Sequence, residues 1–333
     1  MQQEHYWNSS FTPTDDSVYE GNETGIVAID TVSGADAAES GSQSVTITIT
    51  ENESAPTVTL ATSATSIAEN AGSSLTLTAT LSVATTADVT VGISTSGTGT
   101  EGTDYSTISD ITISAGATTG TASFTPTDDS VYEGNETGIV AIASVSGGSA
   151  TEDGTQSVTI TITENESAPT VTLATSATSI AENAGSSLTL TATLSVATTA
   201  DVTVGISTSG TGTEGTDYST ISDITISAGS TTGTSSFTPT DDSVYEGNET
   251  GIVAISTVSG GSATEDGTQS VTITITENES SPTITLSSSA SSIVENAGSS
   301  LTLTATSSIV ADEDITITIS TSGTGTEGTD YGT

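Results

Sequence analysis

The chain has 333 residues and contains no Lys, no Arg and no Cys. Without cationic side chains, it cannot neutralise the phosphates of a nucleic acid or form a polybasic patch on a membrane surface. Without Lys and Cys, it can form neither Lys–Asn isopeptide bonds nor disulfides. Its 42 Asp and Glu residues give a formal net charge of −42, and ordinary salt bridges are excluded as well.

Aromatic residues and long apolar runs are also scarce. Aromatics make up 3% of the chain and apolar residues 32%, so a core must consist mainly of Val, Ile, Leu and Ala. No apolar run approaches the roughly 20 residues of a transmembrane helix, and we expect no direct membrane insertion. Residues 1–8 (MQQEHYWN) lack the apolar stretch of a signal peptide.

The dominant feature that is present is an internal repeat. Residues 54–166 recur as residues 167–279, a period of 113 residues. The two copies differ at four positions, all of them exchanges between small residues that barely change the packing volume: Ala117/Ser230, Ala122/Ser235, Ala143/Ser256 and Ser144/Thr257.

Partial copies flank the two complete ones. Residues 9–53 match the C-terminal part of the repeat, residues 280–333 match its N-terminal part, and residues 1–8 match neither. The sequence therefore reads as an excerpt of a longer tandem array, with residues 1–8 as the edge of a gene fragment. An alternative is that the two partial copies complement each other between chains and polymerise head to tail. Monomers that are independent of concentration would exclude this alternative.

The apolar residues of each copy alternate with polar ones, as in half-buried strands. The pattern is clear in SLTLTATL (74–81), DVTVGI (88–93) and SVTITIT (157–163), where the intervening residues are mostly Thr and Ser. High acidity with few aromatics could indicate disorder, but this regular alternation argues against it. Seven such strands in about a hundred residues, separated by turn residues, predict an immunoglobulin-like antiparallel β-sandwich. The predicted fold class is all-β, with tandem seven-stranded sandwiches.

Strand direction then predicts where the acidic residues gather. Successive strands of a sandwich run in opposite directions, so alternate connections meet at the same end. One end of the sandwich is formed by three alternate connections and by the end of the last strand, and it carries nine carboxylates. The opposite end has only Asp88, Glu152 and Asp153. The nine are Glu69, Glu101, Asp104, Asp128, Asp129, Glu133, Glu136, Glu164 and Glu166.

Such crowding requires a counter-ion. Two unit charges about 4 Å apart repel by about 4 kcal/mol at an effective dielectric constant near 20. Protonation would relieve the repulsion, and so would a bound cation. Carboxylates and loop carbonyls suit Ca²⁺, whereas Zn²⁺ would favour the His or Cys ligands that the repeats lack. A solvated acidic loop is the plainer interpretation of any one of these segments.

The motifs SIAENAG (66–72), GTDY (102–105) and DDSVYEGNE (128–136), followed by the acidic run ENE (164–166), resemble the Calx-beta domain. The resemblance covers about residues 9–333. It implies a seven-stranded sandwich that binds Ca²⁺ in the loops at one tip, as in sodium/calcium exchangers and in bacterial surface and adhesion proteins. Residues 164–166 depart from the aspartate run that is frequent in the family, which puts the number of ions and their affinity in doubt.

The resemblance also implies a ligand set. In the first complete copy the set is Glu69, Asp104, Asp128, Asp129, the Val131 carbonyl, Glu133, Glu136, Glu164 and Glu166. In the second copy it is Glu182, Asp217, Asp241, Asp242, the Val244 carbonyl, Glu246, Glu249, Glu277 and Glu279. The partial copies hold only half a set each, and we expect them to bind weakly or not at all: Asp15, Asp16, Glu20, Glu23, Glu51 and Glu53 in one, and Glu295 and Asp330 in the other.

We expect a calcium-stabilised structural array, the stalk of a large secreted or cell-surface bacterial protein. Its partners would be calcium ions and neighbouring repeats, because the linker between copies is only about three residues (SAP, 167–169). A calcium-sensing regulatory module is the alternative, and submicromolar affinity would favour it. An enzyme is not expected, since His5 lies outside the repeat. A face of Thr-x-Thr strands that binds ice is a further alternative.

Overall fold

The structure, a computed structural model, describes residues 5–332. These residues belong to two compact units, Met1–Glu166 and Ser167–Thr333, and each unit is considered by itself. Residues 1–4 of the predicted leader and residue 333 of the last predicted segment lie outside the described residues. Within the described part, no helix has the length and hydropathy that crossing a membrane requires.

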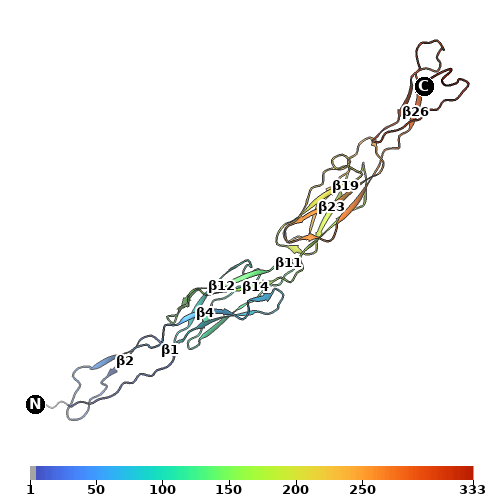
Figure 1. Ribbon diagram of the computed structural model, residues 1–333. Helices are drawn as coiled ribbons and strands as arrows, with labels where there is room; N and C mark the ends of the chain where they lie inside the picture. Colours follow the sequence, from blue (N-terminus) through green and yellow to red (C-terminus); the bar gives the residue numbers. More distant parts are fainter. Residues whose placement is uncertain (1–4, 333) are drawn as a thin grey trace. The chain divides into compact units, whose positions relative to one another are not determined.

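Residues 54–166 form a sandwich of two sheets, as the alternation predicts (Figure 1). One sheet has the order β10-β6-β4-β13 and the other the order β5-β14-β12-β8-β9. The first sheet contains β4 (Thr57–Thr62), β6 (Leu75–Leu81), β10 (Thr119–Phe124) and β13 (Thr151–Glu152). The second contains β5 (Ser66–Ala68), β8 (Val89–Gly97), β9 (Ile111–Ile113), β12 (Glu136–Ser146) and β14 (Ser157–Thr163). The two-residue strands β7 (Ala84–Thr85) and β11 (Val131–Tyr132) belong to neither sheet.

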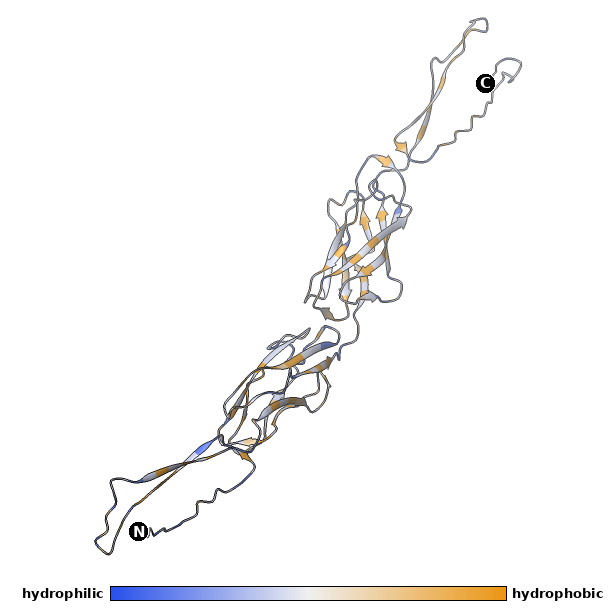
Figure 2. Cartoon of the chain, turned by 60° about the vertical axis from the view of Figure 1, so that its left-hand side comes forward, coloured by the Kyte–Doolittle hydropathy of each residue, from blue (hydrophilic) through white to orange (hydrophobic). Residues whose placement is uncertain are grey.

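The core lies between the two sheets and consists of the residues that alternate inward. Leu77, Ile111 and Ile160 are fully buried, and the apolar positions follow the strands of both sandwiches (Figure 2). One aromatic pair extends this core: the rings of Tyr105 and Phe124 stack with their centroids 4.6 Å apart. The aliphatic composition therefore suffices for a packed interior.

Gly138 in β12 admits this aromatic pair. A Cβ atom at this position would lie 2.7 Å from the Phe124 ring, which is closer than packed atoms allow. Because β12 begins at Glu136, the aromatic pair lies directly beneath the acidic end of the strand. Glycine at this position therefore lets the core reach up to that end.

The first two strands of the domain belong to different sheets. β4 pairs with β6, whereas β5 pairs in parallel with the end of β14, so that Ala68 lies opposite Thr163. The ladder continues one residue further, because the Glu69 N–H donates to the Thr163 carbonyl at 3.0 Å. The switch between sheets thus places the loop that starts at Glu69 beside the last residues of β14.

Residues 167–279 repeat this architecture in the second unit, with sheets β21-β17-β15-β24 and β16-β25-β23-β19-β20. The long strands of the two copies, β12 and β23, share a bulge, and two of the four differing positions lie there: Ala143/Ser256 and Ser144/Thr257. The strands are β15 (Thr170–Thr175), β16 (Ser179–Ala181), β17 (Leu188–Leu194), β18 (Ala197–Thr198), β19 (Val202–Gly210), β20 (Ile224–Ile226), β21 (Thr232–Phe237), β22 (Val244–Tyr245), β23 (Glu249–Ser259), β24 (Thr264–Glu265) and β25 (Ser270–Thr276).

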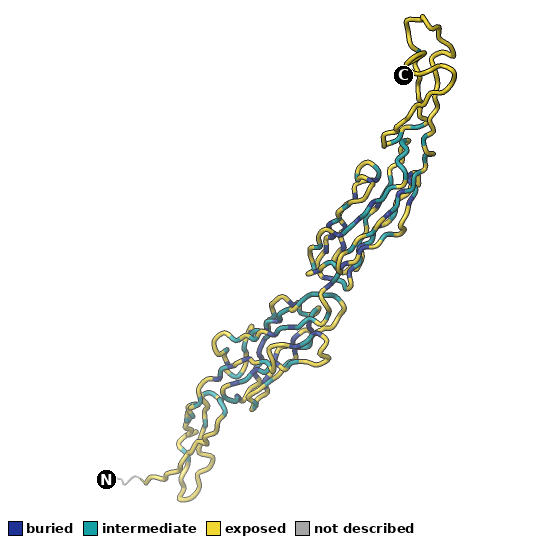
Figure 3. Tube along the Cα trace, turned by 45° about the vertical axis from the view of Figure 1, so that its right-hand side comes forward, coloured by how far each residue is buried: buried dark blue, intermediate teal, exposed yellow. Residues whose placement is uncertain are grey.

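The flanking segments are more open (Figure 3). Before the first sandwich, β2 (Glu23–Ala28) pairs with β3 (Ser44–Ile49), and Ile26 of this hairpin is 71% exposed. After the second sandwich, β26 (Ile284–Ser288) pairs with β27 (Leu303–Ser307). Each flank also contributes one two-residue strand, β1 (Val18–Tyr19) and β28 (Val310–Ala311).

Candidate metal centre

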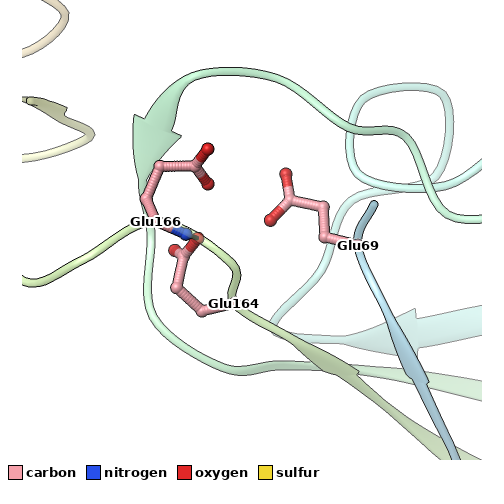
Figure 4. A group of neighbouring side chains, drawn as sticks. All are labelled: Glu69, Glu164 and Glu166. Carbon is pink, nitrogen blue, oxygen red and sulfur yellow. Dashed lines mark hydrogen bonds between the residues drawn. The ribbon is translucent and has the colours of Figure 1, made fainter. Parts of the chain in front are cut away.

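Two clusters of three carboxylates lie at one pole of the first sandwich. The first contains Glu69, which follows β5, and Glu164 and Glu166, which follow β14. One carboxylate oxygen from each residue lies within 4.8 Å of the others. Glu69 is only 7% exposed, and its carboxylate faces that of Glu166 across a small gap (Figure 4). The pairing of β5 with β14 thus brings together acids almost a hundred residues apart in sequence.

The second cluster contains Asp104, Glu133 and Glu136. Its three ligand atoms also lie within 4.8 Å of one another, and all three residues are half-buried. Asp104 is fixed in its turn because its Oδ2 accepts the Thr100 N–H and its carbonyl accepts the Thr127 N–H. Glu136 begins β12, so the sheet itself positions the third carboxylate.

Glu164 holds the loop that carries the other acids. Its Oε2 accepts the N–H groups of Glu133 and Gly134 at 2.6 and 2.8 Å. Its Oε1 accepts those of Asn165 and Glu166, both at 2.9 Å. Burial raises the pKa of Glu164, but these backbone donors outweigh burial and lower the pKa below its ordinary value. Glu164 therefore stays ionised and ties the loop to the end of β14.

The other acids have the opposite tendency. Burial raises the pKa of Glu69, Glu133 and Glu136 to about 7, and repulsion from neighbouring carboxylates adds to the effect. For Glu69 the largest neighbouring charge is Glu164, and for the other two it is Asp104. Three carboxylates per sandwich are thus difficult to ionise near neutral pH unless a cation is present.

The profile of the Calx-beta domain matches residues 51–166 and 164–279. The chain belongs to the Calx-beta domain family. The sequence resemblance to this family and the tandem arrangement are thereby confirmed.

Solved structures with similar folds have low sequence identity to this Calx-beta array. CBD12 from CALX1.2 is 15% identical with a TM-score of 0.30, over 66% of this chain and 99% of that one. The adhesin InvE of Yersinia pseudotuberculosis is 14% identical with a TM-score of 0.31, over 66% and 58%. Invasin, a bacterial integrin-binding protein, is 18% identical with a TM-score of 0.26, over 80% and 51%. No curated protein matches the chain, so the assignment rests on the family profile.

The residues of this Calx-beta site fit a hard divalent cation. All the side-chain donors are carboxylate oxygens, the ligands that Ca²⁺ prefers. Glu166 Oε2 is buried and has no hydrogen-bond partner among the described residues. A buried acceptor without a hydrogen-bond partner costs free energy. A cation bound to the cluster would remove this cost.

The remaining predicted ligands of the first Calx-beta domain lie around these clusters. Asp128 and Asp129 are exposed on the loop before β11. Asp129 Oδ1 accepts the Val131 N–H at 2.7 Å, which fixes the loop locally. The charge of Asp128 contributes to the raised pKa of Glu166, after the larger effects of Glu164 and burial. The ligand role of these residues and of the Val131 carbonyl stays a prediction.

The second Calx-beta domain repeats the geometry closely. Its clusters are Glu182, Glu277 and Glu279, and Asp217, Glu246 and Glu249. Glu182 is 6% exposed and accepts the Asp242 N–H at 3.2 Å, while Asp242 accepts the Val244 N–H. Glu279 Oε2, like Glu166 Oε2, is buried and has no hydrogen-bond partner in the part of the chain that the structure describes. Asp241, like Asp242, lies on the exposed loop before β22.

Glu101 does not join either cluster, although it was predicted at the same tip. Its Oε2 accepts the Thr95 hydroxyl at 2.6 Å and its Oε1 accepts the Ile108 N–H at 2.7 Å. Both oxygens are therefore occupied by the fold, and the same holds for Glu214 in the second domain. The sequence gives no signal for this difference, because Glu101 and Asp104 share one short loop.

The flanking segments contain no cluster of three acids that could hold a metal, within the part of the chain that the structure describes. In segment 9–53, Glu51 nevertheless holds its loop as Glu164 does in the first domain. It accepts the N–H groups of Glu20 and Gly21, both at 2.6 Å. These bonds, after that of the Glu53 N–H, lower the pKa of Glu51 to about 2. Glu295 and Asp330 lie in the other flank, in exposed positions.

Proposed function

We propose that the chain is an array of calcium-binding structural modules. In this proposal, ions at the acidic pole of each Calx-beta domain rigidify the stalk of a secreted or cell-surface protein. The array acts mechanically, with no catalytic step. The supporting observation is that each complete domain holds two three-carboxylate clusters, while the chain has no Lys or Arg to neutralise them.

Electrostatics favour a cation over protonation at neutral pH. The clusters combine ionised carboxylates such as Glu164 with others whose pKa lies at about 7. A divalent ion would let all members ionise and would exchange their mutual repulsion for attraction. The donor set does not match the ligands of a usual Zn²⁺ site, which are His and Cys side chains.

Within each domain, Glu69 and Glu166, or Glu182 and Glu279, would hold the ion in the first cluster. Asp104, Glu133 and Glu136, or Asp217, Glu246 and Glu249, would hold it in the second. Glu164 and Glu277 fix the loop backbone through four N–H bonds each, so they orient the donors around them. The ion would supply charge neutralisation and cross-linking of the loops.

The expected gain in stability is large relative to that of a domain. Extracellular calcium modules have dissociation constants of about 10⁻⁴ to 10⁻³ M. At a hundredfold excess of free Ca²⁺ over the dissociation constant, one site adds about 2.7 kcal/mol to the free energy of unfolding. Two sites per domain would then approach the marginal stability of the domain itself.

Calorimetric titration of the full chain with CaCl₂ tests this proposal. We expect saturable binding with near-millimolar affinity, and loss of binding when Glu69→Gln and Glu182→Gln are combined with Asp104→Asn and Asp217→Asn. The control combines Asp110→Asn and Asp223→Asn, whose carboxylates each accept one backbone N–H from β8 or β19 away from the clusters. No binding by the parent chain, or equal binding by both variants, would contradict the proposal. Submicromolar affinity would favour the sensor alternative.

A further inference from the structure

The two flanking segments are complementary parts of one repeat. Segment 9–53 corresponds to residues 122–166, and segment 280–333 corresponds to residues 54–107. Of the complete repeat, residues 108–121 have no counterpart in either segment. These residues include β9 and the first half of β10, which lie at the outer edges of the two sheets. The central strands of a complete sandwich are therefore divided between the two segments.

Each segment is largely exposed, including residues that the complete domains bury (Figure 3). Val27 of β2 is 49% exposed, whereas its counterpart Val140 is fully buried. Leu303 of β27 is also 49% exposed, whereas its counterpart Leu77 is fully buried. Both segments thus present the inner face of part of a sandwich, an apolar surface of the kind that a partner covers.

The strand pairing within segment 9–53 leaves one edge open. β2 pairs with β3 in the same register as β12 pairs with β14. In the complete domain, the other edge of β12 pairs with β8. The counterpart of β8 is residues 315–323, which form no strand. Among the described residues β2 therefore has an unpaired edge, to which an extended segment can add as a further strand.

The aromatic pair of the core is divided in the same way. In the first domain, Tyr105 and Phe124 stack on each other and are at most 1% exposed. The counterpart Phe11 is 44% exposed, and the counterpart Tyr331 is 36% exposed. Phe11 already packs on β2, because a Cβ atom at Gly25 would lie 2.9 Å from its ring. One half of the stack is thus in place, and the ring that completes it belongs to the other segment.

We propose that segment 280–333 of one copy of the chain docks on segment 9–53 of a second copy, and that the two segments together complete one sandwich. In this complex, residues 315–323 add to the open edge of β2, as β8 adds to β12, and the Tyr331 ring stacks on Phe11. Each copy has one surface of each kind, so the contact is heterologous and repeats head to tail.

Docking also brings the divided ligand sets together. The completed clusters are Glu295 with Glu51 and Glu53, and Asp330 with Glu20 and Glu23. This consequence rests on the proposed function, whereas the docking of the two apolar faces does not. Carboxylates of the two copies repel one another when no cation is bound. We therefore expect Ca²⁺ to strengthen the docking.

Light scattering after size-exclusion chromatography tests the docking with the full chain. We expect the mass to increase with protein concentration in CaCl₂. We expect the same in EDTA with about 1 M NaCl, where the Debye length of about 3 Å screens the repulsion. Monomers at every concentration in both solutions would overturn the proposal.

The same measurement separates docking from metal binding. Association in NaCl that CaCl₂ does not strengthen would support the docking and contradict the completed metal clusters. Calorimetry that detects no Ca²⁺ binding by the chain would contradict the proposed function, while association in NaCl with EDTA would still support the docking.

Two variants of one hairpin locate the contact. Val27→Asp places a charge on the inner face of β2, where the residue is exposed before docking, and association should be lost. The matched control Thr46→Asp places the same charge on the outer face of β3, because its counterpart Thr159 is exposed in the complete domain. This control should associate as the parent does. Equal association of the two variants would overturn the proposal.

Cross-linking tests the register of the docked strands. In the first domain, Ala141 lies opposite Ser94. Their counterparts are Ala28 and Ser320, which docking places opposite each other between two copies. The chain has no Cys, so a mixture of Ala28→Cys and Ser320→Cys chains should form covalent dimers on oxidation, at a higher yield than either chain alone.

The control mixture combines Ala28→Cys with Thr316→Cys. Thr316 precedes Ser320 by about 13 Å along an extended strand, too far for a disulfide in the proposed register. We expect few covalent dimers from this mixture. Equal yields from the two mixtures would overturn the proposed docking.

Discussion

The two poles of each sandwich carry acidic residues that lie in different surroundings. At the pole opposite the clusters, Asp88 and Glu152 each accept a nearby backbone N–H, from Ala115 and Gln156 respectively. At the candidate metal pole, Glu69 and Glu133 face other carboxylates, and their pKa rises to about 7. The comparison teaches that a high acidic content alone does not bring carboxylates together. The convergence of several chain segments at one pole does so.

Removal of calcium from the pole that holds the clusters should produce the largest change in stability. With two sites per domain and a hundredfold excess of Ca²⁺ over the dissociation constant, EDTA should lower the free energy of unfolding by about 5 kcal/mol. For a domain of this size, the melting temperature should fall by about 20 °C. Differential scanning calorimetry measures this shift. An unchanged melting temperature would contradict a structural role for the ion.

Truncation of Glu164, the side chain that clamps the acidic loop through its backbone N–H groups, should have the next largest effect on stability. Glu164→Ala leaves the N–H groups of Glu133 and Gly134 without their acceptor, and should cost about 2–3 kcal/mol of the first domain's stability in EDTA. Asp88→Ala at the opposite pole removes one bond and should cost about 1 kcal/mol. Urea denaturation of the two variants measures the difference. Equal losses would show that the clamp is no more important than an ordinary turn.

The pH dependence of the melting temperature should also distinguish the clustered carboxylates from those at the opposite pole. Because the pKa of Glu69, Glu133 and Glu136 is about 7 in the folded chain and about 4.5 unfolded, the folded state binds more protons between these values. Their contribution is fully present below pH 4.5 and is lost as the pH rises through 7. The melting temperature in EDTA should therefore fall between pH 5 and pH 8.

Saturating Ca²⁺ should remove this decline, because the ion keeps the carboxylates ionised at both pH values. Glu69→Gln combined with Glu182→Gln should weaken the decline in EDTA. By contrast, the lowered pKa of Glu277, about 2, contributes stability above pH 4.5 that is lost only in strong acid. A melting temperature that rises from pH 5 to pH 8 in EDTA would contradict the assignment.

The smallest effect is expected for Glu166→Gln combined with Glu279→Gln. In EDTA these changes should alter the free energy of unfolding by less than about 1 kcal/mol, since the affected Oε2 atoms have no hydrogen-bond partner to lose among residues 5–332. In calcium they should weaken binding by about tenfold, a change of about 1.4 kcal/mol. Calorimetric titration beside thermal melts in EDTA measures both. A large loss of stability without any loss of affinity would assign these residues to the fold.

Much of the fold and the general position of the site could be predicted from the sequence. Alternation of period two places residues such as Leu77 and Ile160 inward, and antiparallel order brings alternate loops to one pole. The clustering of Glu69 with Glu164 follows from that order. Its immediate cause does not follow from that order. The cause is the short strand β5, which pairs in parallel with β14 of the second sheet.

What could not be predicted depends on single hydrogen bonds. Glu101 and Asp104 are three residues apart, yet the Thr95 hydroxyl and the Ile108 N–H take the first out of the site. Glu164 was predicted only as a ligand, whereas its four backbone donors also make it the clamp of the loop. Tyr105 completes the core through its stack on Phe124, a contact that no periodic pattern indicates.

The most direct test of the account is a crystal structure of the chain grown with Ca²⁺, with anomalous diffraction data that locate the ions. The account predicts anomalous peaks within both carboxylate clusters of each complete domain, beside Glu69 and Glu166 and beside Asp104 and Glu136. Peaks at the opposite pole, near Asp88 or Glu152, or no peaks in these clusters, would contradict it.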